Sequence, residues 1–135
     1  GRCEVHERFT ADEIMAYKQQ HKDIVVLAHP ECSPEVIAVS DFAGSTAGMS
    51  NYVKDNQPGK VIMVTECSMS DNVAIENPNV EFIRPCNLCP HMKRISLKKI
   101  YDAIRFNQYQ IQVDKAIIDK ARLSIDRMLE IGRSS

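Results

Sequence analysis

The chain has 135 residues, which suits one domain with a buried core. Its net charge of -1, from 17 basic and 18 acidic side chains, provides no basic surface for nucleic acid and no polybasic patch for a membrane. The longest apolar runs are too short to span a bilayer and no signal-peptide pattern is visible, so we expect a cytoplasmic protein.

Strand patterns and helix patterns alternate over the first 95 residues. Continuous apolar runs, typical of strands buried on both faces, predict strands at 24–28, 61–64 and 80–83, with a short strand at 41–43. Helical segments separate them. This alternation predicts an α/β fold, a three-layer α/β/α domain with a short parallel sheet.

Capping signals mark where the helices of this domain begin. Thr10 and Glu13 form a capping box, which predicts a helix to about residue 21. The pair Ser33-Pro34 predicts another helix to about residue 40. A third helix follows Gly44 and extends to about residue 55, and Ser70 is expected to cap a fourth, short helix.

Two further helices are predicted after this domain. Ser96 caps the first, and the second begins at Asp114 and ends at Gly132; each has an apolar stripe at helical spacing. We therefore divide the chain into three parts. These are an entry loop at 1–10 with a candidate metal or cluster ligand, an α/β domain at 11–95, and C-terminal helices at 96–135 that pack on it.

Polar and reactive residues follow several of the predicted strands. Because the carboxyl ends of parallel strands meet at one edge of a sheet, we expect these residues to converge there, where ligands bind in open α/β sheets. The segments are His29-Pro30-Glu31-Cys32, Gly44-Ser45-Thr46, Thr65-Glu66-Cys67 and the loop from Cys86 to Cys89.

Two of these segments contain residues that are candidates for acting on or binding a substrate. Pro30 fixes the backbone between His29 and Glu31, and an imidazole beside a carboxylate can share general acid–base work. The alternative is a histidine that is simply satisfied by its neighbour. Ser45 and Thr46 provide hydroxyls and amides at a helix N-terminus, a natural anion site, although an ordinary helix cap after a turn glycine is the explanation that their sequence alone favours.

The five cysteines lack the density of a secreted disulfide scaffold and favour an intracellular protein that uses thiols for a metal or for redox chemistry. The C-x-x-C spacing of Cys86 and Cys89 suits a metal or cluster, a redox disulfide, or two unrelated buried thiols. One alternative is therefore a non-catalytic zinc-binding module that uses Cys3, His6, Cys86 and Cys89. Another is a thiol oxidoreductase that uses Cys86 and Cys89.

Five motifs together resemble the quinolinate synthase family in their order and spacing. They are Cys3-Glu-Val-His6, Leu27-Ala-His29-Pro-Glu, Gly44-Ser-Thr, Thr65-Glu-Cys-Ser and Cys89-Pro-His-Met-Lys. The resemblance covers only the C-terminal part of that family, whose members have three similar α/β domains around a central active site. It implies an enzyme of NAD biosynthesis, a transferase that condenses iminoaspartate with dihydroxyacetone phosphate to quinolinate.

The resemblance also implies a cofactor and a set of site residues. The family uses a 4Fe-4S cluster held by three cysteines, with one open iron as a Lewis acid. Carried over by motif, Cys3 and Cys89 are cluster ligands, whereas Cys32 and Cys86 are not required. Glu31 and His29 become catalytic residues, and His29, Glu31, Ser45 and Thr46 become substrate-binding residues.

The family's first cysteine ligand and its N-terminal substrate-binding residues have no counterpart in this chain. We therefore expect the remaining N-terminal domains of the same enzyme to be its partner, with small-molecule substrates and neither nucleic acid nor membrane. The chain alone is not expected to complete the site.

Overall fold

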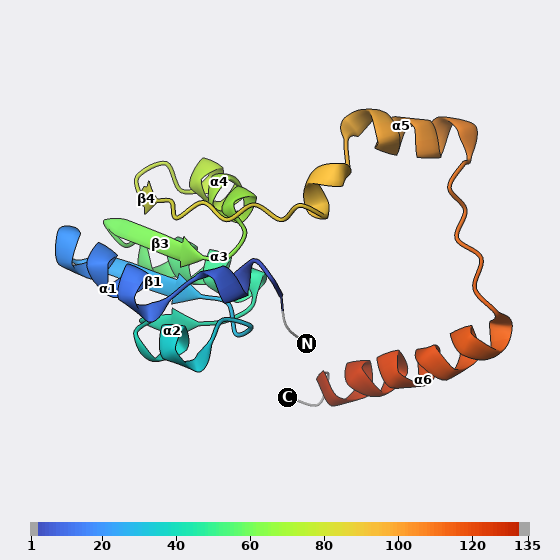
Figure 1. Ribbon diagram of the computed structural model, residues 1–135, viewed down its shortest axis with the longest axis horizontal. Coiled ribbons are helices and arrows are strands. Elements are labelled where there is room, and N and C mark those ends of the chain that lie inside the picture. The colour runs from blue at the N-terminus through green and yellow to red at the C-terminus, as the bar shows by residue number, and fades with distance from the viewer. Residues whose placement is uncertain (1–2, 133–135) are drawn as a thin grey trace. The chain divides into compact units, whose positions relative to one another are not determined.

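The computed structural model describes residues 3–132, and these fall into two compact units, with the division along the chain between Arg94 and Ile95. Figure 1 shows the course of the chain through both. The ends of the predicted entry loop and of the predicted C-terminal helical segment lie outside the described residues. That the C-terminal helices pack on the α/β domain remains a prediction.

The first unit is built on a parallel sheet of four strands in the order β2-β1-β3-β4 (Figure 1). Their bounds are β1 Ile24–Ala28, β2 Phe42–Ala43, β3 Lys60–Val64 and β4 Glu81–Ile83. In the register, Ala28 lies opposite both Ala43 and Val64, so the three strands end level with one another. The predicted parallel sheet is confirmed, and its carboxyl edge brings the strand-end loops together.

Helices cover both faces of this sheet (Figure 1). Because successive strand residues face opposite sides, β1 divides its apolar side chains between two cores. Ile24, Val26 and Ala28 pack with the helices α1 and α2, while Leu27 packs with α3 and α4. This arrangement confirms the three-layer α/β/α architecture. The helix bounds are α1 Ala11–Gln20, α2 Pro34–Ala38, α3 Thr46–Asn56 and α4 Cys67–Glu76.

The predicted start of the fourth helix is wrong by one turn. α4 begins at Cys67 because Glu66, not Ser70, is its N-cap: the Glu66 carboxylate accepts a hydrogen bond of 2.7 Å from the Ser68 N–H. Ser70 instead lies buried inside the helix. The capping box of Thr10 and the cap of Ser33 with its following proline are both confirmed.

The second unit contains two amphipathic helices, α5 Leu97–Phe106 and α6 Lys115–Gly132. Ser96 caps α5 as predicted, and the Asp114 carboxylate accepts a hydrogen bond of 2.8 Å from the Ala116 N–H at the start of α6. None of their described residues is buried. No helix within residues 3–132 has the length and apolar character needed to cross a membrane.

Candidate active site

A cavity of about 440 Å³ lies at the carboxyl edge of the sheet, within the first unit. Residues from the N-terminal segment and from the loops after β1, β2, β3 and β4 line it, as expected for a parallel sheet. Its polar and sulfur-bearing lining includes Cys3, His6, His29, Glu31, Thr46, Thr65, Glu66 and Cys89. The cavity lining therefore includes every site residue implied by the family resemblance except Ser45, whereas Cys86 of the zinc and thiol alternatives does not line it.

His6 lies at the centre of the polar network in this cavity. Its Nδ1 is 3.0 Å from Glu31 Oε2, and its Nε2 is 3.0 Å from Thr65 Oγ1. The imidazole also stacks on that of His29, with ring centroids 4.5 Å apart and planes 6° from parallel. His6 is turned inward by the short 3-10 helix η1 His6–Arg8. The sequence argument gave His6 a role only in the zinc alternative.

The surroundings of His6 favour its neutral form. Burial, followed by the neighbouring His29, lowers the pKa of His6 below 6.5, although Glu31 opposes this shift. A neutral imidazole carries one N–H, and a carboxylate only accepts. We therefore assign the proton to Nδ1, which donates to Glu31, while the Thr65 hydroxyl donates to Nε2.

The Glu31 carboxylate lies close to both histidines of the cavity. Its Oε2 lies 3.7 Å from His29 Nδ1, in addition to the 3.0 Å contact with His6. The Glu31 backbone N–H donates to His29 Nδ1 at 3.3 Å, so a neutral His29 carries its proton on Nε2. The structure thus brings the predicted acid–base pair together, but the closer partner of Glu31 is His6.

The hydroxyls of Ser45 and Thr46 have different environments. Ser45 Oγ accepts a hydrogen bond of 3.1 Å from the Gly48 N–H and caps α3, whereas Thr46, the first residue of α3, lines the cavity. The preceding Gly44 allows the tight entry into α3, because a Cβ there would lie 2.6 Å from the Phe42 ring. The cavity therefore has a helix N-terminus and one hydroxyl at this corner.

Three metal-ligand atoms converge in the same cavity. The Cys3 sulfur, one ring nitrogen of His6 and one carboxylate oxygen of Glu31 all lie within 4.8 Å of one another. Thiolate, imidazole and carboxylate together form a donor set for a transition metal. Cys89 is a second free, half-buried thiol on the lining, and its sulfur accepts a hydrogen bond of 3.5 Å from the Met92 N–H. These residues fit a metal centre with thiolate ligands.

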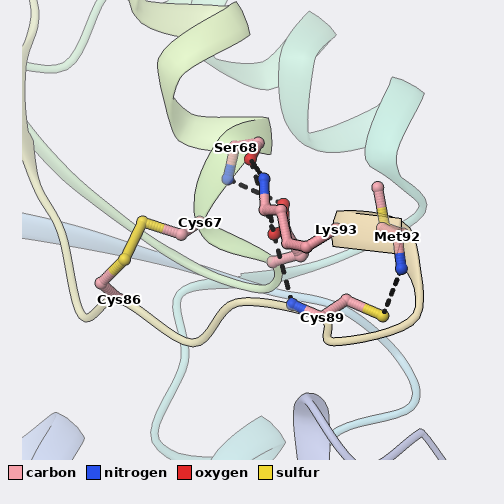
Figure 2. A network of polar contacts seen from close by, with 7 residues as sticks. Cys67, Ser68, Cys86, Cys89, Met92 and Lys93 are labelled. Carbon is pink, nitrogen blue, oxygen red and sulfur yellow. Dashed lines mark hydrogen bonds and ion pairs between the residues drawn. A yellow bond between two sulfur atoms is a disulfide. The ribbon is translucent and has the colours of Figure 1, made fainter. Parts of the chain in front are cut away.

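The other cysteines are occupied elsewhere. Cys67 and Cys86 form a disulfide, so Cys86 does not pair with Cys89 and its thiol is not free for the zinc set that includes it (Figure 2). Cys32 is buried with its thiol directed at the Val64 carbonyl, and burial raises the pKa of Cys32 to about 11. A thiol with so high a pKa is a poor ligand and nucleophile.

Residues 1–130 match the protein family described as "Quinolinate synthetase A protein". The chain is 57% identical over 129 residues to "Quinolinate synthase 1" of Mesorhizobium japonicum, covering 96% of this chain and 40% of that protein. It is 57% identical over 131 residues to "Quinolinate synthase" of Agrobacterium fabrum, covering 97% of this chain and 38% of that protein. It is 55% identical over 131 residues to "Quinolinate synthase" of Xylella fastidiosa (strain Temecula1), covering 97% of this chain and 39% of that protein. The chain thus spans about two fifths of the length of the curated relatives it matches.

Proposed function

Because the chain belongs to the quinolinate synthetase A protein family, we propose that it is the C-terminal part of a quinolinate synthase, the transferase that makes quinolinate from iminoaspartate and dihydroxyacetone phosphate. The observation that carries this proposal is the shared cavity. Cys3, His29, Glu31, Thr46 and Cys89 come from four separate segments of the chain and line one space of about 440 Å³.

In this proposal Cys3 and Cys89 would be two of the ligands of a 4Fe-4S cluster, and the third cysteine would come from the remaining N-terminal domains. When bound, the cluster supplies an open iron that acts as a Lewis acid on the substrate. The Met92 N–H donates to the Cys89 sulfur, a contact of the kind that tunes cluster cysteines. Glu66 accepts a hydrogen bond of 3.4 Å from the Cys89 N–H and orients the backbone of this ligand.

Glu31 serves as the residue that accepts and returns protons during the condensation. Its carboxylate is 44% exposed at the cavity, while the hydrogen bond from His6 fixes its direction. Thr65 in turn holds His6. A positioned carboxylate of this kind contributes about 10²–10⁴-fold in rate when it acts as a general acid or base.

Two other groups bind substrate in this proposal. Nδ1 of His29 accepts from the Glu31 N–H, which leaves Nε2 of a neutral ring to donate to a substrate carboxylate or hydroxyl. The first turn of α3 offers backbone N–H groups and the Thr46 hydroxyl to a phosphate. Val5, Met69 and Met92 complete the lining with apolar surface, which limits water around the reacting groups.

A second candidate is a mononuclear zinc module, favoured by the Cys3, His6 and Glu31 ligand atoms within 4.8 Å of one another. This set replaces the one expected from sequence, since Cys86 is in a disulfide. A colourless, air-stable chain with one tightly bound zinc supports this candidate. A brown chain whose colour is lost in air supports the cluster.

The test combines reconstitution with complementation. The chain is loaded anaerobically with iron and sulfide, alone and together with the N-terminal part of the Agrobacterium fabrum relative, and quinolinate formation is measured. We expect turnover only in the combined sample, and its loss in Glu31→Gln while bound iron is retained. Glu35→Gln, at an exposed carboxylate of α2, is the matched control and keeps its turnover. Turnover by the chain alone would contradict the incomplete site, and no turnover in the combined sample despite bound iron would contradict the activity.

A further inference from the structure

The backbone pairing that continues from β3 and β4 ends just before Cys89. Beyond the two strands, Glu66 and Asn87 form an isolated parallel bridge, in which the Cys67 N–H donates to the Asn87 carbonyl at 3.2 Å. One step further along a parallel ladder, the Cys89 N–H would donate to the Cys67 carbonyl. Cys67 is instead the first residue of α4, and in a helix this carbonyl accepts from within the helix. The Cys89 N–H therefore needs another acceptor.

The side chain of Glu66 supplies that acceptor. Glu66 Oε1 accepts a hydrogen bond of 3.4 Å from the Cys89 N–H, while Oε2 accepts one of 2.7 Å from the Ser68 N–H and caps α4. One carboxylate thus joins the start of α4 to the backbone of Cys89. The Glu66 side chain is only 12% exposed, so solvent screens these charge-assisted hydrogen bonds little.

Lys93 contacts the same carboxylate from the segment that follows Cys89. Its Nζ lies 3.7 Å from Glu66 Oε1 and donates to Ser68 Oγ at 2.6 Å, a contact that Figure 2 shows. The ammonium supplies a counter-charge, which a carboxylate as buried as Glu66 needs. Lys93 is about half exposed, so its effect is expected to be smaller than that of the carboxylate itself.

We propose that Glu66 and Lys93 are a pair of positioning residues: Glu66 holds Cys89 in place for its metal through the Cys89 backbone, and Lys93 holds Glu66. The proposal rests on the proposed function only in taking Cys89 as a metal ligand. With the pair intact, Glu66 fixes the N–H of Cys89 while the Met92 N–H donates to its sulfur at 3.5 Å. Without the Glu66 carboxylate, the Cys89 N–H loses this acceptor and the thiol moves more freely in the cavity.

A glutamine at position 66 separates the two roles of the carboxylate. The glutamine amide has one acceptor oxygen and one NH₂ group that only donates, so only one of the two N–H groups keeps an acceptor. Because the bond to Ser68 is the shorter, we expect the oxygen to stay on the Ser68 N–H and the NH₂ group to face the Cys89 N–H. Glu66→Gln therefore keeps the cap of α4 and releases Cys89.

The experiment measures thiol reactivity in the iron-free 135-residue chain. Alkylation by iodoacetamide is followed by mass spectrometry at Cys3 and Cys89, which both line the cavity as half-buried free thiols. The samples contain no reductant, so the Cys67–Cys86 disulfide is intact throughout. In Glu66→Gln we expect Cys89 to react about tenfold faster, the effect of losing one charge-assisted hydrogen bond, and Cys3 to keep its rate. A general loosening of the fold would raise both rates.

Lys93→Met tests the second member of the pair. Without the ammonium, Glu66 is held less firmly, and we expect Cys89 to react about threefold faster, with no further increase when the change is added to Glu66→Gln. Charge alone predicts the opposite sign, because removing an ammonium disfavours the reactive thiolate of a nearby cysteine. Glu76→Gln and Lys54→Met, at exposed side chains of α4 and α3, are the matched controls and leave the Cys89 rate unchanged.

Three results would overturn the proposal. They are an unchanged Cys89 rate in Glu66→Gln, an equal increase at Cys3 and Cys89, and a slower Cys89 in Lys93→Met. In the complemented, iron-loaded enzyme, Glu66→Gln is also expected to release iron to a chelator about tenfold faster than Glu76→Gln. The alkylation rates are measured without iron or substrate, so an inactive complemented enzyme leaves them unaffected and the two proposals can fail separately.

Discussion

His6 Nδ1 lies 3.0 Å from Glu31 Oε2, although the two residues are 25 positions apart and belong to different segments of the chain. His6 comes from the N-terminal 3-10 turn, and Glu31 follows the central strand β1. The direction of the proposed proton-transfer group is therefore set by a residue from outside the sheet. The candidate metal ligand Cys3 and the candidate base Glu31 also belong to one cluster, together with His6.

Replacing His6 by alanine is expected to damage both activity and stability. Without the imidazole, Glu31 loses its closer partner and the buried Thr65 hydroxyl loses its acceptor. We expect a loss of about 1–3 kcal/mol in the free energy of unfolding from the unsatisfied hydroxyl. Misplacement of Glu31 is expected to lower quinolinate formation by the complemented enzyme about 100-fold. His21→Ala, at the C-terminal end of α1, is the control and is expected to keep its activity.

Thr65→Val removes the hydroxyl that donates to His6 Nε2 while nearly keeping the side-chain volume. Thr65 is 3% exposed, so bulk solvent has little access to the position of the lost donor. A buried imidazole nitrogen without a partner costs about 1–3 kcal/mol, which urea denaturation can measure. Thr65→Ser retains the hydroxyl and is expected to lose less stability than Thr65→Val. Equal losses in the two variants would show that packing, not the hydrogen bond, determines the effect.

The lowered pKa of His6 predicts how stability depends on pH in the metal-free chain. The folded chain resists protonation at His6 more than the unfolded chain does, whose histidine has the ordinary value of 6.5. This contribution to stability is therefore fully present above pH 6.5 and is lost as the pH falls through the lower folded value. Urea denaturation at pH 7.5, 6.5 and 5.5 should show a decline that is absent from His6→Gln. A decline of equal size in His6→Gln would assign it to other groups.

The parallel sheet and much of the site were predictable from local sequence rules. Apolar runs such as 24–28 and 61–64 can be buried on both faces only in a covered sheet, and the caps at Thr10 and Ser33 mark where helices begin. Parallel strands then bring His29, Glu31 and Thr46 to one edge without any knowledge of side-chain packing.

The contacts that were missed depend on where distant segments fold back. His6 lies in a turn with no periodic pattern, and its place beside Thr65 follows from the burial of Val5 and Phe9 in the core. The C-x-x-C spacing drew attention to Cys89 as the partner of Cys86, whereas the fold places Cys86 against Cys67, 19 residues away. The number of residues between two side chains predicts how close they lie only when both belong to one continuous segment. A parallel sheet brings the ends of its strands together whatever the number of residues between those strands.

Iron binding should separate the two proposed cluster ligands from the other cysteines. Cys3 and Cys89 line the site cavity as free thiols, while Cys32 is buried under the Val64 carbonyl and Cys86 is bonded to Cys67. After anaerobic reconstitution with the complementary N-terminal part, we expect Cys3→Ser and Cys89→Ser to lose most of the bound iron and sulfide. Cys32→Ala, which keeps the core apolar, is expected to retain both at the level of the unmodified chain. Cys86→Ser is expected to bind iron but to release it faster to a chelator, because the segment that carries Cys89 is no longer covalently joined to α4. Full iron retention in Cys89→Ser would remove Cys89 from the ligand set and leave Cys3, His6 and Glu31 as the metal site.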